Sequence, residues 1–421
     1  MENRQDRISF KELLAFAALT VAYGTIFRVP FIKNVFYDPL MAAYGLTNTD
    51  IATMMSVYTI IKTIFYIPCG VLSDALGGCK AITLPTAVMS VLTVWYAFAN
   101  SFTELLIIQA LLGLCVDTMV PAAVKCLRAF GNKGGQGLSF GGAELVRAVA
   151  SMAVNFGALG VYSAAATSAT PFRPVLLFYA GYYALISVAN WFLSPNVVTE
   201  KSKKVTLKEI GQCLKLPAVW IVSFMSMTAY AVQVVNDYTT PYLTNVMGMS
   251  VVLAGTIAII RNYGISLFTG PIMGFINDKT KRYSKNVMFI EVIMFIVGIA
   301  FIILPGDPTY VMAGVGLIVV GSLMIYSFNA TQFTMLEELS IPRELTGTVT
   351  TIICMVAYTP DMWMALLIGN KLDQNPGAEA YKSVFVYILI FSALTFVLAW
   401  VASRIAKKNK EKAAAIPAGE N

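Results

Sequence analysis

Two arginines stand inside long apolar stretches of the sequence, and they carry its clearest chemical signal. Arg28 closes an apolar run that begins near Leu13, and Arg261 interrupts a second run in the other half of the chain. An ionised side chain within hydrocarbon costs a few kcal/mol or more unless it faces a cavity or a partner. A guanidinium offers a planar fork of donors that matches the oxygens of a carboxylate or a phosphate. The two arginines therefore predict a site for a small anion.

The composition determines what kind of chain holds these charges. Of the 421 residues, 57% are hydrophobic and 13% are charged, which is far more apolar than a soluble domain of this length requires. Runs of roughly 15 to 20 apolar residues are long enough to span a bilayer as helices, and they lack the alternation of barrel strands. The sequence therefore predicts an all-α integral membrane protein.

The same composition excludes several kinds of chemistry. The chain has no histidine, no Cys-x-x-Cys pair and no carboxylates at metal-ligand spacing. Metal, haem and serine–histidine chemistry are accordingly disfavoured, and we expect no enzyme activity and no cofactor. The six cysteines are expected to stay reduced.

Charged and Pro/Gly-rich breaks divide the chain into twelve predicted transmembrane helices. Their ranges are 12–36, 50–73, 80–99, 103–127, 137–162, 173–194, 217–244, 251–276, 285–304, 309–336, 345–370 and 380–404. With this division, nearly all lysines and arginines of the loops fall on one side of the membrane, and the other side holds only Lys33, Arg173, Lys371 and Lys382. Because basic loops stay cytoplasmic, we expect a multi-pass protein of the cytoplasmic membrane with both termini in the cytoplasm. The net charge of +7 then reflects topology and does not indicate a nucleic-acid partner.

The predicted helices form two halves. A polar, lysine-rich segment separates the sixth from the seventh helix and predicts a cytoplasmic linker. We expect a six-helix bundle over 1–194, the linker over 195–216, a second six-helix bundle over 217–404 and a disordered cytoplasmic tail over 405–421.

A glycine and aspartate motif recurs in the two halves. The first copy holds Gly70, Asp74 and Gly77 between the second and third helices, and the second copy holds Gly274 and Asp278 between the eighth and ninth. Together with the six-plus-six layout, this repeat resembles the major facilitator superfamily over essentially the whole chain. The resemblance implies secondary transport by two pseudo-symmetric bundles, with the motif acting as a cytoplasmic gate. The basic residue usual after the first aspartate is replaced here by Ala75.

Two groups within that superfamily share one arginine each with this chain. Glycerol-3-phosphate and hexose-phosphate exchangers are similar in carrying an arginine in helix 1, which matches Arg28, but they pair it with an arginine in helix 7, where this chain has Val232 and Gln233. The oxalate/formate exchanger and nitrate porters resemble it in placing an arginine in helix 8, which matches Arg261. These likenesses leave phosphate ester and carboxylate as alternatives.

The depth of both arginines is predicted to be similar. At 1.5 Å per residue, Arg28 lies about 24 Å and Arg261 about 22 Å from the expected cytoplasmic ends of their helices. One guanidinium from each half is thus expected at one level near the bilayer midplane, where an anion would satisfy both. The structural alternatives are that Arg28 reaches the outer surface and that Arg261 pairs with a carboxylate.

Other polar groups are expected to complete the site. Lys62 and Asp117 are predicted to pair between helices, and Glu144 and Arg147 within one helix. Asp361 follows Pro360 in a helix that we expect to be kinked there, and with Asp117 and Glu144 it is a candidate proton carrier. The remaining candidate substrate contacts are hydrogen-bonding side chains that also commonly join helices; they are Tyr23, Tyr58, Tyr230, Gln233, Asn329 and Tyr358.

These observations predict an alternating-access transporter of a small organic anion, working as a proton symporter or as an exchanger, and acting as a monomer. Two alternatives remain. One is a transporter-like sensor that binds a ligand and signals to a partner. The other is a transporter of a neutral sugar or drug, for which replacing Arg28 or Arg261 would leave uptake largely intact.

Overall fold

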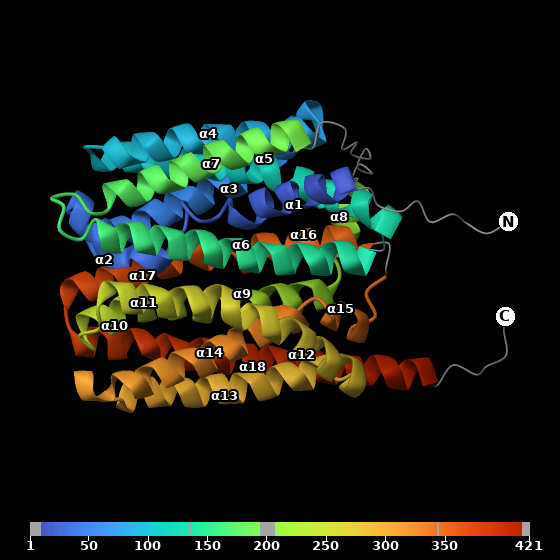
Figure 1. Ribbon diagram of the computed structural model, residues 1–421. Coiled ribbons are helices and arrows are strands. Elements are labelled where there is room, and N and C mark those ends of the chain that lie inside the picture. Colours follow the sequence, from blue (N-terminus) through green and yellow to red (C-terminus); the bar gives the residue numbers. More distant parts are fainter. Residues whose placement is uncertain (1–9, 135, 194–206, 343–344, 415–421) are drawn as a thin grey trace. The chain divides into compact units, whose positions relative to one another are not determined.

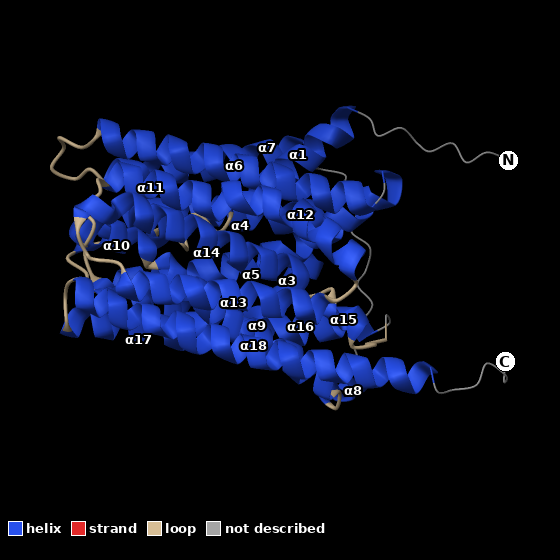
Figure 2. Ribbon diagram, turned by 90° about the horizontal axis from the view of Figure 1, so that it is seen from below, coloured by secondary structure: helices blue, strands red, loops and turns tan. Residues whose placement is uncertain are grey.

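The computed structural model describes residues 10–134, 136–193, 207–342 and 345–414, and every regular element in these ranges is a helix (Figures 1 and 2). Eleven of the helices are long and apolar enough to cross a membrane. The first predicted helix is not among them, because it is split into two shorter pieces. This architecture confirms the all-α membrane fold.

The first half of the chain follows the predicted segments closely. Its helices are α1 (Phe10–Thr25), α2 (Lys33–Tyr44), α3 (Asn48–Leu76), α4 (Gly78–Phe98), α5 (Phe102–Gly134), α6 (Gln136–Ala164), α7 (Arg173–Leu193) and α8 (Leu207–Leu214). Local sequence explains several of the ends. Thr47 and Asp50 form a capping box at the start of α3, and Gly45, with a φ of 64°, closes α2.

The second half contains more interrupted helices. They are α9 (Pro217–Asp237), α10 (Thr239–Asn245), α11 (Val251–Ile259), the π-helix η1 (Ile260–Gly264), α12 (Ile265–Thr280), α13 (Tyr283–Ile303), the 3-10 turn η2 (Pro308–Tyr310), α14 (Val311–Thr331), α15 (Met335–Glu338), α16 (Thr346–Ala357), α17 (Pro360–Gln374) and α18 (Ala378–Ala414). The kink expected at Pro360 is present, since α16 ends at Ala357 and Pro360 opens α17.

Three predictions about local structure are wrong. The continuous helix over 12–36 is broken, because residues 26–32 form turns around Pro30, which has no backbone N–H. The motif from Gly70 to Gly77, expected between the second and third helices, is instead the last part of α3, and only Gly77 leaves the helix, with a φ of 77°. The tail predicted to be disordered from residue 405 is helical as far as Ala414, with an ion pair of 3.7 Å between Lys407 and Glu411. Most of the predicted linker, 194–206, lies outside the described residues.

The chain forms two compact units. The first comprises residues 1–202 and 250–267, and the second comprises residues 203–249 and 268–421. The short stretch 250–267, which holds α11, η1 and the start of α12, groups with the first unit because α11 packs against α2 and α6. The sequence places the same stretch in the second bundle.

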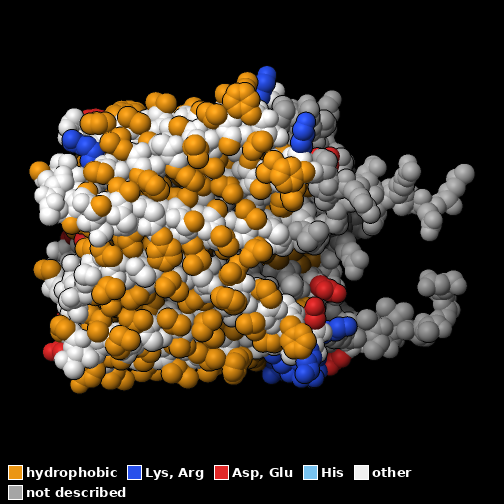
Figure 3. Space-filling view, viewed as in Figure 1, with side chains coloured by type: hydrophobic (Ala, Val, Ile, Leu, Met, Phe, Trp, Pro, Cys, Tyr) orange, Lys and Arg blue, Asp and Glu red, His pale blue; other side chains and the backbone are white. Residues whose placement is uncertain are grey.

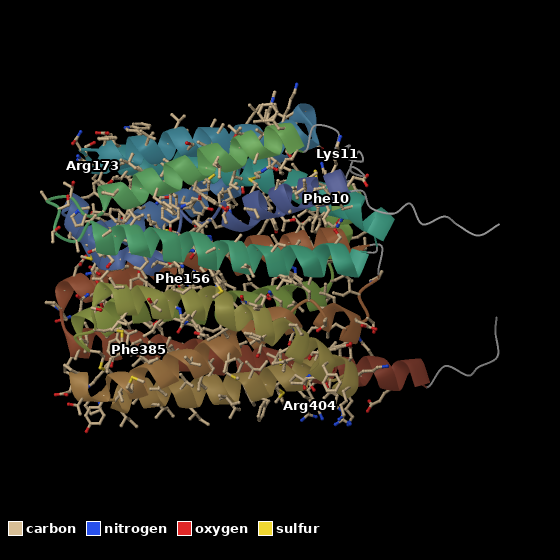
Figure 4. The ribbon with its side chains drawn as sticks, viewed as in Figure 1. Phe10, Lys11, Phe156, Arg173, Phe385 and Arg404 are labelled. Atoms are coloured by element: carbon tan, nitrogen blue, oxygen red, sulfur yellow. The ribbon has the colours of Figure 1, made fainter. Side chains whose placement is uncertain are left out.

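Each unit has its own helix packing. In the first, α3 packs on α5, α4 on α7 and α1 on α6 (Figure 1). In the second, α13 packs on α18, and α9 packs on α18 and α16. The aromatic core of the second unit includes Phe385, labelled in Figure 4, whose ring stacks on Phe301 with 4.5 Å between centroids. Packing of this kind, with little charge inside, is what apolar helices in a bilayer require.

The helix surfaces are apolar as well. Many large hydrophobic side chains are highly exposed, including Ile67, Phe192 and Met312. In the face shown in Figure 3, hydrophobic side chains cover the lengths of the helices, whereas charged side chains gather toward the helix ends. Exposed apolar surface on this scale indicates contact with lipid.

Candidate functional site

The break in the first predicted helix gives Arg28 its position. Between α1 and α2 the chain passes through turns, and the amide of Arg28 donates to the carbonyl of Thr25 at 3.0 Å. Two tyrosines of α7 hold this break. The Tyr183 hydroxyl donates to the Thr25 carbonyl at 3.0 Å and accepts from the Val29 amide at 3.4 Å, and the Tyr182 hydroxyl donates to the Thr25 hydroxyl at 3.1 Å. Backbone groups that the helix no longer pairs are thus satisfied inside the first unit.

The Arg28 side chain rests on an aromatic ring. Its Cζ atom lies 4.3 Å from the centroid of the Tyr263 ring, a distance typical of a cation–π interaction. Tyr263 belongs to η1, so this contact joins the break after α1 to the π-helix. A guanidinium can stack on a ring face and donate hydrogen bonds from its edge at the same time.

The other arginine lies in the same π-helix. Arg261 is 2% exposed and is among the largest fully buried side chains of the protein. Its Nε atom donates to the amide oxygen of Asn262 at 3.2 Å. A π-helix is a single-turn departure from α-helical geometry that is frequent at functional sites. Here the π-helix holds both Arg261 and, two residues later, Tyr263, whose ring contacts Arg28.

Both arginines therefore belong to the first compact unit. The sequence predicts one from each half, and the difference arises because the stretch 250–267 packs with the first unit. Arg28 rests on the ring of Tyr263, and Arg261 stands two residues before that tyrosine in η1.

A second charged group lies between α3 and α5. The Nζ atom of Lys62 is 4.0 Å from Oδ1 of Asp117, which is 3% exposed, whereas the lysine side chain is 28% exposed. The same Nζ lies 5.3 Å from the ring centroid of Tyr58 and 5.9 Å from that of Phe27. The structure thus brings Lys62, Asp117 and Tyr58 together, and Phe27, which directly precedes Arg28 in the chain, lies beside Lys62.

The pair on α6 is more exposed. Nε of Arg147 lies 3.0 Å from Oε2 of Glu144, and both side chains are more than a third exposed. Gly24 of α1 packs directly on Arg147, since a Cβ atom at that glycine would lie 2.6 Å from Arg147 Cγ. Tyr23, the neighbour of Gly24, lies within electrostatic reach of this pair.

The candidate residues of the second unit form two groups. The Tyr230 hydroxyl donates to Oδ2 of Asp361 at 2.8 Å, and the Tyr230 and Tyr358 rings meet edge to face with centroids 4.9 Å apart. Asp361 is 7% exposed and stands in the first turn of α17. Separately, the Asn329 side-chain amide donates to the Gln233 carbonyl at 3.2 Å. The second unit thus offers neutral hydrogen-bonding groups around one carboxylate.

The glycine and aspartate motif has a partner in its own unit. Asp74, near the end of α3, accepts a hydrogen bond from Lys125 of α5. The resemblance leads one to expect a basic residue at position 75, which is an alanine here. Lys125 of α5 supplies a basic partner for Asp74 instead. In the second copy Gly274 and Asp278 lie within α12, and Lys281, with a φ of 47°, makes the turn that follows.

Sequence reasoning missed several of these roles. Tyr263, Tyr182 and Tyr183 were not singled out, because their importance comes from partners far away in the chain. Pro30 was a usable signal for the break after α1. Within the part of the chain that the structure describes, no three His, Cys, Asp or Glu side chains gather where they could hold a metal ion.

The comparisons with known proteins identify the class to which this fold and these charges belong. The family model of the Major Facilitator Superfamily matches residues 14–360, so the chain belongs to that superfamily. It is a transporter and not an enzyme.

Individual proteins agree with this assignment. The chain is 27% identical over 418 residues to the inner membrane protein YihN of Escherichia coli K12, covering 96% of this chain and 99% of that protein. A bacterial homologue of the human lysosomal transporter Spinster, in an inward-facing and unoccupied conformation, has the same fold, with a TM-score of 0.77, 16% identity and coverage of 95% and 98%. The nucleoside transporter NupG also shares it, with a TM-score of 0.68, 13% identity and coverage of 93% and 98%.

Proposed function

We propose that this protein is a secondary active transporter that moves a small organic anion by alternating access, as a proton symporter or as an exchanger. The observation that carries the proposal is the burial of Arg261, which is 2% exposed within a π-helix whose Tyr263 ring lies against Arg28. Two guanidinium groups at one short element suit a ligand with planar, charged oxygens. A carboxylate and a phosphate ester both meet this description.

The remaining site residues receive roles within the same proposal. Tyr23, Tyr58, Tyr230, Gln233, Asn329 and Tyr358 are assigned to contacts with the neutral part of the substrate, because each offers a hydrogen-bonding side chain. Lys62 adds positive charge. Asp117, Asp361 and Glu144 are assigned to proton coupling, since a carboxylate that loses its partner during transport can take up a proton.

The cellular arrangement is part of the proposal. We place the protein in the cytoplasmic membrane as a multi-pass monomer with both termini in the cytoplasm, supported by the basic loops of the sequence and by a relative named an inner membrane protein. We also propose that residues 195–216 are a cytoplasmic linker between the two six-helix bundles. A reporter that fluoresces only in the cytoplasm, fused after Asn421, tests this orientation. If the fusion protein inserts stably into the membrane but does not fluoresce, the cytoplasmic placement of the C-terminus is wrong.

A ligand screen by thermal shift tests the substrate class. Carboxylates, phosphate esters, sulfonates, inorganic anions, nucleosides and neutral sugars are each added to the purified protein, because a ligand that binds only the folded state raises the unfolding midpoint. We expect one class of organic anion to raise it in the wild type and in Arg404→Gln, but not in Arg261→Gln. Arg404 is a matched control, since it is an exposed arginine in the C-terminal part of α18, ten residues before that helix ends, and its Cζ lies 5.0 Å from the Trp400 ring centroid (Figure 4).

A neutral substrate is the second candidate, favoured by the uncharged Gln233–Asn329 pair. It predicts stabilisation by nucleosides or sugars that survives in Arg261→Gln. That result would overturn the anion proposal and return both arginines to structural roles.

A further inference from the structure

A glutamate in the second unit is buried in the middle of a membrane-spanning helix. Glu291 lies on α13 and is 4% exposed. Its Oε2 atom is fully buried and has no hydrogen-bond partner among the described residues. A buried polar atom without a partner is costly, and a buried charge without one is costlier still. Apolar packing alone therefore does not explain why a glutamate stands at this buried position.

The surroundings of Glu291 contain no charge that would stabilise a carboxylate. It lines a cavity of about 10 Å³ formed by α9, α13 and α14, where Asn329 is the one other polar side chain and the rest are apolar. The Ser392 hydroxyl of α18 faces the same carboxyl. These neighbours suit a protonated carboxyl, which can donate a hydrogen bond to a neutral acceptor.

The helices packed around Glu291 carry few charged residues, and these lie toward the helix ends. Helix α14 has no charged residue along its length, and α9 has only Asp237 at its end. On α13 itself the exposed Lys285 stands six residues before Glu291, about 9 Å along the axis. The charges of α18 nearest to Ser392 in sequence are Lys382 and Arg404, each at least ten residues distant. The titratable tyrosines Tyr230, Tyr326 and Tyr387 do not line the cavity.

The cavity connects Glu291 to a hydrogen-bonded pair already described. Its volume is close to the space that one water molecule needs. Asn329, which also lines the cavity, donates to Gln233 of α9. A water in this position would have the Glu291 carboxyl and the Asn329 amide as partners, which gives a proton a short route between the carboxyl and the Asn329–Gln233 pair.

We propose that Glu291 is a proton-binding site of the second unit, which takes up and releases its proton through the cavity that it shares with Asn329. The step is a simple transfer in which the carboxyl O–H bond breaks, the proton passes to a water molecule and the carboxylate remains. Its use in driving transport rests on the proposed function, whereas proton binding itself does not.

Infrared spectroscopy of the protein in lipid vesicles tests the proposal without any substrate. A protonated carboxyl has its own C=O stretching band, and we expect one that fades when the vesicles are made alkaline and returns on acidification. The band should be absent in Glu291→Gln, which keeps the shape of the side chain but cannot ionise. It should remain in Asp361→Asn and Asp117→Asn.

Isotope labelling keeps the test decisive if a variant fails to fold. In the wild type, labelled glutamate should move the band and labelled aspartate should not. The proposal would be overturned by a band that does not shift with labelled glutamate, or by one that is still present in Glu291→Gln. A band of unchanged intensity at every pH would also overturn it, because such a carboxyl never releases its proton. Since no anion is involved, failure of the anion screen leaves this result standing, and the reverse also holds.

Discussion

The guanidinium of Arg28 lies over the ring of Tyr263, with Cζ 4.3 Å from the ring centroid. Tyr263 stands two residues from the buried Arg261 in the π-helix η1. This contact links the broken first helix to the interrupted eighth one within a single compact unit. Each of the two irregular segments carries one of these arginines, so the departure from regular helix geometry determines where the arginine side chain lies.

Removing the aromatic ring should weaken anion binding. In Tyr263→Leu the Arg28 side chain loses a cation–π contact worth about 1 kcal/mol, so the dissociation constant of the stabilising anion should rise ~5-fold. Tyr263→Phe keeps the ring and should bind almost as the wild type does. Ligand titrations followed by thermal shift give both constants, and equal losses in the two variants would point to the hydroxyl instead of the ring.

The close approach of α1 and α6 should tolerate no added side chain. In Gly24→Ala the new Cβ would lie 2.6 Å from Arg147 Cγ and 2.7 Å from its backbone Cα, so the helices must separate. Overpacking of this kind costs about 1–3 kcal/mol. The matched control is Gly160→Ala on α6, where nothing lies within 4 Å of the new atom. Thermal unfolding in detergent should show a clear loss for the first variant and none for the second.

The tyrosine beside Asp361 should contribute to the stability of the second unit. Tyr230→Phe removes a hydrogen bond of 2.8 Å to a buried carboxyl and leaves that group with one partner fewer. The expected cost is about 1.5–3 kcal/mol if the carboxyl is ionised and about 1 kcal/mol if it is protonated. Tyr358→Phe retains the edge-to-face ring contact and serves as the comparison. An unfolding midpoint for Tyr230→Phe equal to that of the wild type would show that the hydrogen bond adds nothing.

The ion pair at the gate motif should be weak on its own. Asp74 is 52% exposed, and exposed pairs contribute about 0.2–1 kcal/mol. A double-mutant cycle with Asp74→Asn and Lys125→Gln should give a coupling energy in that range, which falls as salt is added. A coupling of several kcal/mol, unaffected by salt, would mean that the pair is buried in the working protein.

The sequence predicted the positions of most helices well, because charged and proline-rich breaks mark where the chain leaves the membrane. The repeat of Gly70 and Asp74 by Gly274 and Asp278 led to the correct superfamily. The kink at Pro360 followed from the missing backbone donor.

Other features had no local signal. The π-helix around Arg261 depends on packing of η1 against α6, which the sequence of η1 does not reveal. The grouping of residues 250–267 with the first unit cannot be seen in the sequence repeat, since it arises from contacts with α2 and α6. The unpartnered oxygen of Glu291 and the cavity that it shares with Asn329 likewise depend on the three-dimensional arrangement.

The measurement that tests the account most directly is exchange of the stabilising anion by protein in liposomes. Vesicles loaded with unlabelled anion receive a trace of labelled anion outside, and uptake is compared among the wild type, Arg28→Gln, Arg261→Gln and Arg404→Gln. We predict rapid uptake by the wild type and Arg404→Gln, and loss of uptake in the other two. Uptake that persists without either arginine would contradict the anion site, and binding without any exchange in the wild type would indicate a ligand sensor instead of a transporter.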